Sequence, residues 1–145
     1  MYSVLAGYCW PPAAAAAVLS SEGLGMVKAV GDEAEARALQ HLLRHGLQLV
    51  QRNYRVARGP GRAGGEVDLV MRDRDGTLVF VEVRARGRLT QGGAAASVGA
   101  AKQRRLIFAA RHFLLRLPTL PPCRFDVVAI DAGALEWIRA AFDAG

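Results

Sequence analysis

Three acidic residues in one short stretch of the chain could hold a divalent metal ion. Glu66 and Asp68 lie in a segment of alternating character, and Glu82 lies in a second such segment that follows a turn at residues 74–76. β-Branched and aromatic residues on both sides of an Asp-Gly turn predict a β-hairpin. Because side chains alternate faces along a strand, Glu66 and Asp68 share one face of the first strand.

The length of the turn decides whether Asp68 and Glu82 meet, because a slip of one residue moves every side chain to the other face of a strand. A two-residue turn would leave Asp68 opposite Val83 and point the two acids apart. A three-residue turn sets Asp68 across from Glu82, and it needs a left-handed residue at its last position, which Gly76 supplies. We therefore predict the three-residue register.

In that register the Cβ atoms of Asp68 and Glu82 would lie roughly 4.5–5.5 Å apart. Like charges so placed destabilise a sheet unless something compensates them. Mg²⁺ takes one or two protein carboxylates and fills its octahedron with water and phosphate oxygens, and such an ion supports phosphodiester hydrolysis. The spacing alone leaves two interpretations open: a metal site, or a solvated acidic face beside many arginines.

Four segments in order resemble the YraN family of small bacterial proteins: GGEVDLV, LVFVEVR, AAKQRRL and RFDVVAI. That family is similar to Holliday-junction resolvases and belongs to the restriction-endonuclease-like PD-(D/E)xK nuclease superfamily. The resemblance covers residues 30–142. It implies an α/β fold, a restriction-endonuclease-like mixed β-sheet flanked by helices.

The resemblance also implies roles for individual residues. Asp68 matches the metal-binding aspartate of the superfamily, and Glu82 matches the acid of its (D/E)xK element. The family usually has lysine where this chain has Arg84, and that lysine is thought to orient or deprotonate the attacking water. Arginine can clamp a phosphate through two hydrogen bonds, but it keeps its proton at any working pH. Catalytic activity is therefore the open point of this interpretation.

Further site residues follow from the same resemblance. Asp32 matches the place of an acid that related resolvases use as an additional metal ligand, although it could simply face the positive end of a helix dipole. Glu66 would assist Asp68. Gln103 lies in the AAKQRRL segment, where related nucleases place a polar or basic side chain near the scissile phosphate. Asp126 of RFDV is expected to be structural. The implied cofactor is Mg²⁺ or Mn²⁺.

The charge of the chain favours a polyanionic partner. The formal net charge is +6 and the isoelectric point is about 10.1, which on a small domain favours nucleic acid. All basic residues except Lys28 and Lys102 are arginines; GC-rich coding produces the same bias, so the composition alone is weak support. The basic residues that we expect beside DNA lie on the first strand, two loops and the second long helix: Arg52, Arg62, Arg86, Arg88, Lys102 and Arg105.

Periodicity and breaker residues predict the remaining elements. A helix is expected over residues 30–46 and a longer one over 98–117. Strands are expected over 47–56 and 123–130, and the segment 135–142 fits a strand or a short helix.

Residues 1–27 differ in composition from the single nuclease-like domain that we expect over residues 28–145. They contain one charged residue, Glu22, and lack the positively charged start of a secretory signal. Their apolar run is too short to span a bilayer. Three interpretations of this segment are open: a disordered tail, a poorly packed helix, or an over-extended start of translation. We favour the last, with Met26 as the initiator.

Cys9 and Cys123 have no metal-ligand spacing. A reducing cytoplasm is therefore the simplest location, no membrane partner is expected, and Cys123 is predicted to be a small buried residue.

The leading hypothesis is a Mg²⁺- or Mn²⁺-dependent nuclease acting on DNA, branched or single-stranded. The alternative is a DNA-binding or adaptor protein that retains the nuclease fold without catalysis. Many nucleases of this fold act as dimers, which leaves a homodimer open.

Overall fold

The computed structural model describes residues 26–86, 98–131 and 133–145. Two helices and five strands follow one another in these ranges, which confirms the predicted α/β class and makes the last segment a strand. They are α1 (Met26–Arg44), β1 (Gln48–Val56), β2 (Gly65–Arg72), β3 (Leu78–Arg86), α2 (Ala100–Leu114), β4 (Cys123–Asp131) and β5 (Ala134–Phe142). The expectations for residues 1–25 and for Arg88 fall outside the described residues.

The strands form one mixed sheet in the order β1-β2-β3-β4-β5. All neighbours run antiparallel except β3 and β4, which run parallel. Parallel neighbours need a crossover connection, and the segment that contains α2 provides it. The apolar run of β4 fits its inner place in the sheet, where Val127 and Val128 are fully buried.

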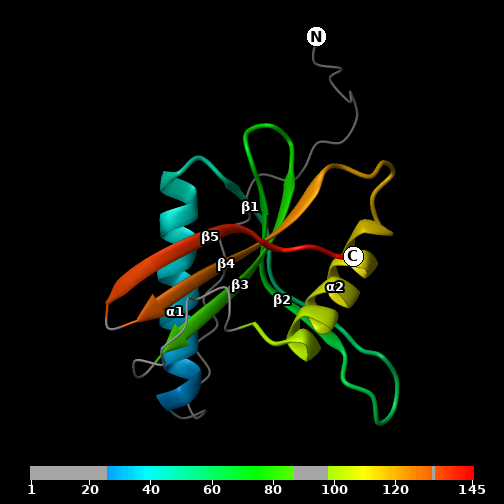
Figure 1. Cartoon of the computed structure of the whole chain (residues 1–145), viewed down its shortest axis with the longest axis horizontal. Coiled ribbons are helices and arrows are strands. Elements are labelled where there is room, and N and C mark those ends of the chain that lie inside the picture. The colour runs from blue at the N-terminus through cyan, green and yellow to red at the C-terminus, as the bar shows by residue number, and fades with distance from the viewer. Residues whose placement is uncertain (1–25, 87–97, 132) are drawn as a thin grey trace.

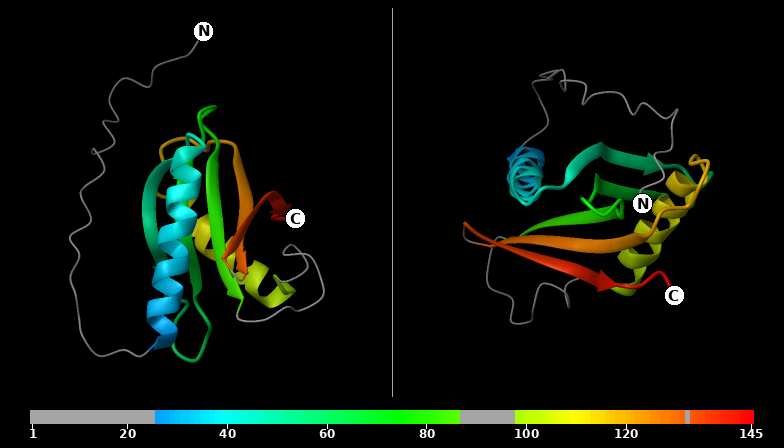
Figure 2. Two further views of the ribbon diagram at one scale, coloured as in Figure 1. Left: turned by 90° about the vertical axis from the view of Figure 1, so that its left-hand side faces the viewer. Right: turned by 90° about the horizontal axis from the view of Figure 1, so that it is seen from above.

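The two helices cover opposite faces of the sheet (Figure 1, Figure 2). On one face, Ala38 and Leu42 of α1 pack against apolar residues of β2, β3 and β4. On the other face, Leu106 and Phe113 of α2 pack against the same three strands. The apolar stripe of each helix thus packs against one face of the sheet, and the central strands are covered on both faces.

The β2–β3 hairpin has the three-residue register that the sequence predicted. Asp73 N donates to Thr77 O at 2.8 Å, and Gly76 has a φ of 89°. The ladder then runs to the pair Leu69↔Val81. Asp68 and Glu82 are the next residues on the two strands, so both acids lie at the level where the ladder ends.

The glycine at the start of β2 has a packing reason. A Cβ atom at Gly65 would lie 2.6 Å from Arg105 O and 2.8 Å from Ala109 N. Only a residue without a side chain lets the middle of α2 approach β2 this closely. Gly65 therefore sets the distance between α2 and the part of β2 that leads to Asp68.

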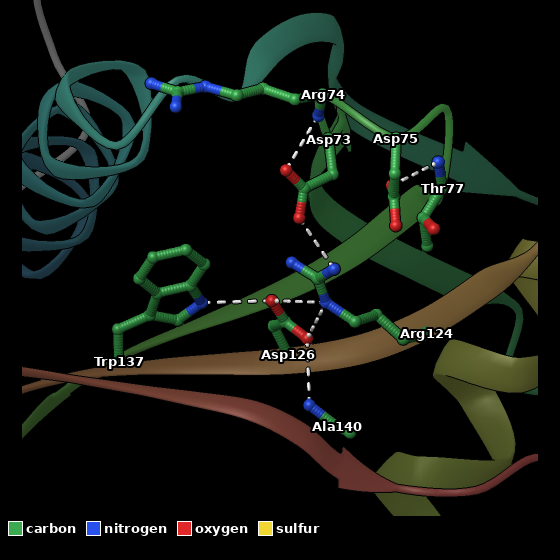
Figure 3. A network of polar contacts seen from close by, with 8 residues as sticks. All are labelled: Asp73, Arg74, Asp75, Thr77, Arg124, Asp126, Trp137 and Ala140. Carbon is green, nitrogen blue, oxygen red and sulfur yellow. Dashed lines mark hydrogen bonds and ion pairs between the residues drawn. The ribbon is translucent and has the colours of Figure 1, made fainter.

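A buried carboxylate ties β4 to β5 and to the hairpin turn (Figure 3). Asp126 is 0% exposed and accepts hydrogen bonds from Arg124 Nε, Trp137 Nε1 and Ala140 N, each at 3.0 Å. Arg124 Nη1 also donates to Asp73 Oδ2 at 2.7 Å. Ala140 has a φ of 48° at an irregularity of the β4–β5 pairing, and Asp126 satisfies its N–H there. The predicted structural role of Asp126 is confirmed.

Cys123 is exposed, and the prediction of a buried cysteine was wrong. It is the first residue of β4, beyond the covered part of the strand, where its Sγ donates to Pro121 O at 3.2 Å. In the described part of the chain, neither helix is both long and apolar enough to cross a membrane.

We expect Asp126→Asn to lower the free energy of unfolding by about 3 kcal/mol, near the lower end for a broken buried ion pair, because Arg124 keeps Asp73 as a partner. Urea unfolding followed by circular dichroism measures this. The matched control, Glu136→Gln, removes an exposed acid from β5 and should change stability by less than about 0.5 kcal/mol. Equal stability of the two variants would refute the role given to Asp126.

Candidate active site

The sheet opens between β2 and β3. The two strands leave their turn together and then separate (Figure 1), β2 continuing beside β1 and β3 beside β4. The backbone N–H of Val83 faces this opening and donates to Asp68 Oδ2 at 2.8 Å. A side chain thus replaces the missing ladder bond, and the Asp68 carboxylate is fixed between the two strands.

Strands β1 and β2 are both irregular at the level of Asp68. Asn53 of β1 lies opposite Asp68 in the register and has a φ of 49°, a left-handed conformation that asparagine tolerates better than most residues. On β2, Val67 and Val70 pack in the same core, although residues three apart on a regular strand face opposite sides. Such irregularities re-aim side chains and are common beside functional sites.

Glu82, which is buried, forms an acidic pair with the half-buried Asp68. Glu82 is 5% exposed. Burial, together with the negative charge of Asp68, raises the pKa of Glu82 to about 8. Burial likewise raises the pKa of Asp68. The opposing influence comes from α2, where Lys102 Nζ lies 3.3 Å from Glu82 Oε1. Two acids and one ammonium therefore meet where the ladder ends.

A third carboxyl group, that of Glu35 on α1, lies within electrostatic reach of this pair. Burial raises the pKa of Glu35, and so does the charge of Asp68, against the opposing effects of Arg52 and Asn53. Glu35 Oε2 is 3.7 Å from Arg52 Nη2, which is beyond hydrogen-bond distance.

The sequence motifs pointed to Asp32, which is exposed one turn earlier, and not to Glu35. The spacing of Glu35, three and seven residues before the buried Ala38 and Leu42, could have identified it, because residues so spaced share a helix face.

Unpaired oxygen atoms test whether the site fits a metal ion. Glu82 Oε2 and Glu35 Oε2 are buried and have no hydrogen-bond donor in the described structure. No group of three or more His, Cys, Asp or Glu side chains gathers closely enough, among the described residues, to hold a metal. The unpaired oxygen of Glu82 could accept a hard cation such as Mg²⁺, which binds one or two carboxylates and otherwise takes water and phosphate oxygens.

The other predicted site residues have different surroundings. Glu66 Oε1 accepts a hydrogen bond from Arg55 Nε at 2.8 Å. Gln103 Nε2 donates to Val98 O at 3.0 Å, beside the start of α2. Arg84 follows Glu82 by two residues on β3 and is half-buried.

The basic residues predicted to contact DNA fall into two groups. Arg52 faces Glu35 and Lys102 faces Glu82, so both belong to the acidic site. Arg62 and Arg105 line a separate pocket. Arg86 is the last residue of β3, and Arg88 lies outside the described residues.

The pKa of Glu82 gives the metal-free protein a pH-dependent stability. Its value of about 8 in the folded chain exceeds the ordinary 4.5, so the folded state binds more protons than the unfolded state between these values. The free energy of unfolding should therefore fall as the pH rises from about 5 to 8. Urea unfolding in EDTA across this range measures the slope.

Glu82→Gln should flatten that slope, whereas Glu136→Gln, which removes an exposed acid, should keep it. A slope that Glu82→Gln leaves unchanged would show that Glu82 is not the titrating group.

Several known proteins that are similar to this chain belong to one family. The sequence model of the Uncharacterised protein family UPF0102 matches residues 34–130. A UPF0102 protein of Methylibium petroleiphilum is 65% identical over 117 residues, which cover 81% of this chain and 96% of the relative. UPF0102 proteins of Paracidovorax citrulli and Cupriavidus taiwanensis are 62% and 59% identical, and each match covers 81% of this chain and 85% of the relative. The matched region contains the whole acidic site, and the chain belongs to UPF0102, the YraN family that the sequence motifs had indicated.

Proposed function

We propose that this protein is a divalent-metal-dependent phosphodiesterase that cleaves DNA. The observation that carries the proposal is the pairing of the half-buried Asp68 with the buried Glu82, whose Oε2 atom has no donor in the described structure. Carboxyl groups with pKa values raised by burial beside a specific charge partner are typical of functional sites. The excess of basic residues in the chain favours a polyanionic substrate.

Asp68 and Glu82 would hold Mg²⁺ or Mn²⁺. When bound, the ion polarises a phosphoryl oxygen and lowers the pKa of a water molecule. The N–H of Val83 keeps the Asp68 carboxylate in place. Glu35 would add negative charge from the α1 side, and Asp32 and Glu66 would contribute charge from further out.

Lys102 would supply the ammonium group that the hairpin lacks. Arg84 stands where related nucleases have lysine, and it keeps its proton. Lys102 Nζ, 3.3 Å from Glu82 Oε1, has further protons to donate. It would stabilise charge on the phosphate or protonate the leaving oxygen. Arg84 would clamp a phosphate oxygen pair, and Gln103 would position water.

The second candidate is a DNA-binding or adaptor protein without catalysis. The observation that favours it is Arg84, which cannot act as a base. Such a protein would bind DNA in EDTA and would not depend on Asp68. A homodimer, a cytoplasmic location and a preference for branched or single-stranded DNA stay predictions.

The purified protein should cleave labelled single-stranded, duplex or four-way-junction DNA with Mg²⁺ or Mn²⁺ and not with EDTA. Asp68→Asn and Lys102→Met should each lower the rate by about 100-fold or more, because the first removes a metal ligand and the second removes the ammonium group beside the reacting phosphate. Arg111→Gln, which removes an exposed charge from the end of α2, is the control and should cleave like wild type.

Cleavage that persists in Asp68→Asn would contradict the proposed site. A silent wild type with an active Arg84→Lys variant would show that the arginine inactivates the enzyme. If every variant binds DNA and leaves it intact, the adaptor function would replace the nuclease function.

Metal binding has a readout that does not depend on activity. Mg²⁺ or Mn²⁺ should raise the midpoint of thermal unfolding of wild type, because a ligand of the native state stabilises it by mass action. Differential scanning fluorimetry measures the shift, and EDTA should reverse it. Asp68→Asn and Glu82→Gln should lose the shift while Glu136→Gln keeps it. A shift that survives in both site variants would place the ion elsewhere.

A further inference from the structure

A basic pocket lies between α2 and the loop that precedes β2. Its volume is about 440 Å³. Four arginines and one aromatic ring line it: Arg58, Arg62, Arg104, Arg105 and Phe108. Neither the acidic pair nor the hairpin contributes to its wall.

Among the described residues, the arginines of the pocket form no ion pair with an acidic side chain. Ion pairs form instead at Arg52, Arg55, Lys102 and Arg124. Guanidinium groups gathered around one cavity repel one another, and a bound anion relieves this repulsion.

Two of the guanidinium groups are held in position by neutral partners. Arg58 lies over the ring of Phe108, with its Cζ 4.8 Å from the ring centroid. Arg105 Nε donates to Gly64 O at 3.1 Å. These contacts reduce the side-chain entropy that an anion would otherwise have to remove. Arg62 and Arg104 are exposed at the pocket and add mobile charge.

The pocket follows the acidic site along the same helix. Arg105 comes one turn after Lys102, a rise of about 4.5 Å along the helix. Successive phosphates of one DNA strand in a duplex are about 3.4 Å apart along the axis. A strand that runs along α2 past Lys102 would therefore reach the pocket within a few nucleotides.

We propose that the Arg58-Arg62-Arg104-Arg105 pocket binds backbone phosphates of the DNA strand that is held at the carboxyl pair. The choice of DNA rests on the proposed function. Guanidinium groups bind phosphate through two parallel hydrogen bonds. Phosphate contacts carry no base information, so binding at the pocket is independent of sequence and sensitive to salt.

The test is the binding of a labelled single-stranded DNA in EDTA, measured by fluorescence anisotropy over a series of salt concentrations. EDTA prevents metal-dependent cleavage, so failure of the pocket and failure of the nuclease are separate results. The double variant Arg62→Gln/Arg104→Gln should bind at least about tenfold more weakly. It should also make the negative slope of log K against log salt shallower by about 1.4, because each lost contact to a single strand contributes about 0.7.

The matched control is Arg44→Gln/Arg111→Gln, which removes the same charge from exposed positions of α1 and α2. It should bind within about twofold of wild type and keep the slope. Asp68→Asn should keep the slope as well. Thermal unfolding midpoints equal to that of wild type verify that both double variants are folded.

Equal weakening by the two double variants would overturn the pocket, because only net charge would then matter. Absence of DNA binding by wild type would also overturn it. Tighter binding of RNA of the same sequence would overturn the choice of DNA.

Discussion

The carboxylate of Asp68 accepts a hydrogen bond from the backbone N–H of Val83 where the pairing of β2 and β3 ends. A ladder bond at this level would have continued the sheet and left no opening. The side chain allows the strands to part without an unsatisfied backbone donor, which would be costly in the interior. The left-handed Asn53, the change of alternation on β2 and the burial of Glu82 all occur at this one level.

Two buried carboxylates of this fold differ in what surrounds them. Asp126 has donors for both of its oxygens, from Arg124, Trp137 and Ala140. Glu82 has a lysine at one oxygen and, within the described ranges of the chain, no donor at the other. A satisfied buried carboxylate rigidifies a structure, whereas an unsatisfied one destabilises it unless a ligand completes it. The contrast separates a structural acid from a candidate metal ligand, and proteins tolerate such destabilisation mainly at functional sites.

The helix α2 connects the parts of the molecule that the proposed chemistry needs. Leu106 and Phe113 of this helix pack into the core. Lys102 of the same helix contacts Glu82, and Arg104 and Arg105 line the basic pocket. Close contact with Gly65 sets the distance of this helix from β2. Lys102 of the helix can therefore reach the same carboxylate pair that a lysine in place of Arg84 on the hairpin would reach. The site keeps an ammonium group although β3 carries arginine at this position.

The sequence by itself determined the fold class, the hairpin and its register, because the turn length and Gly76 act over a few residues. It also predicted that Asp68 and Glu82 lie side by side and that Asp126 is structural. The tertiary structure decided which acid of α1 lies near Asp68, since Glu35 is half-buried whereas Asp32, one turn earlier, is exposed. It also divided the arginines and lysines between the acidic site and the basic pocket. The partner of a long charged side chain depends on elements that are remote in sequence, and local periodicity carries no information about them.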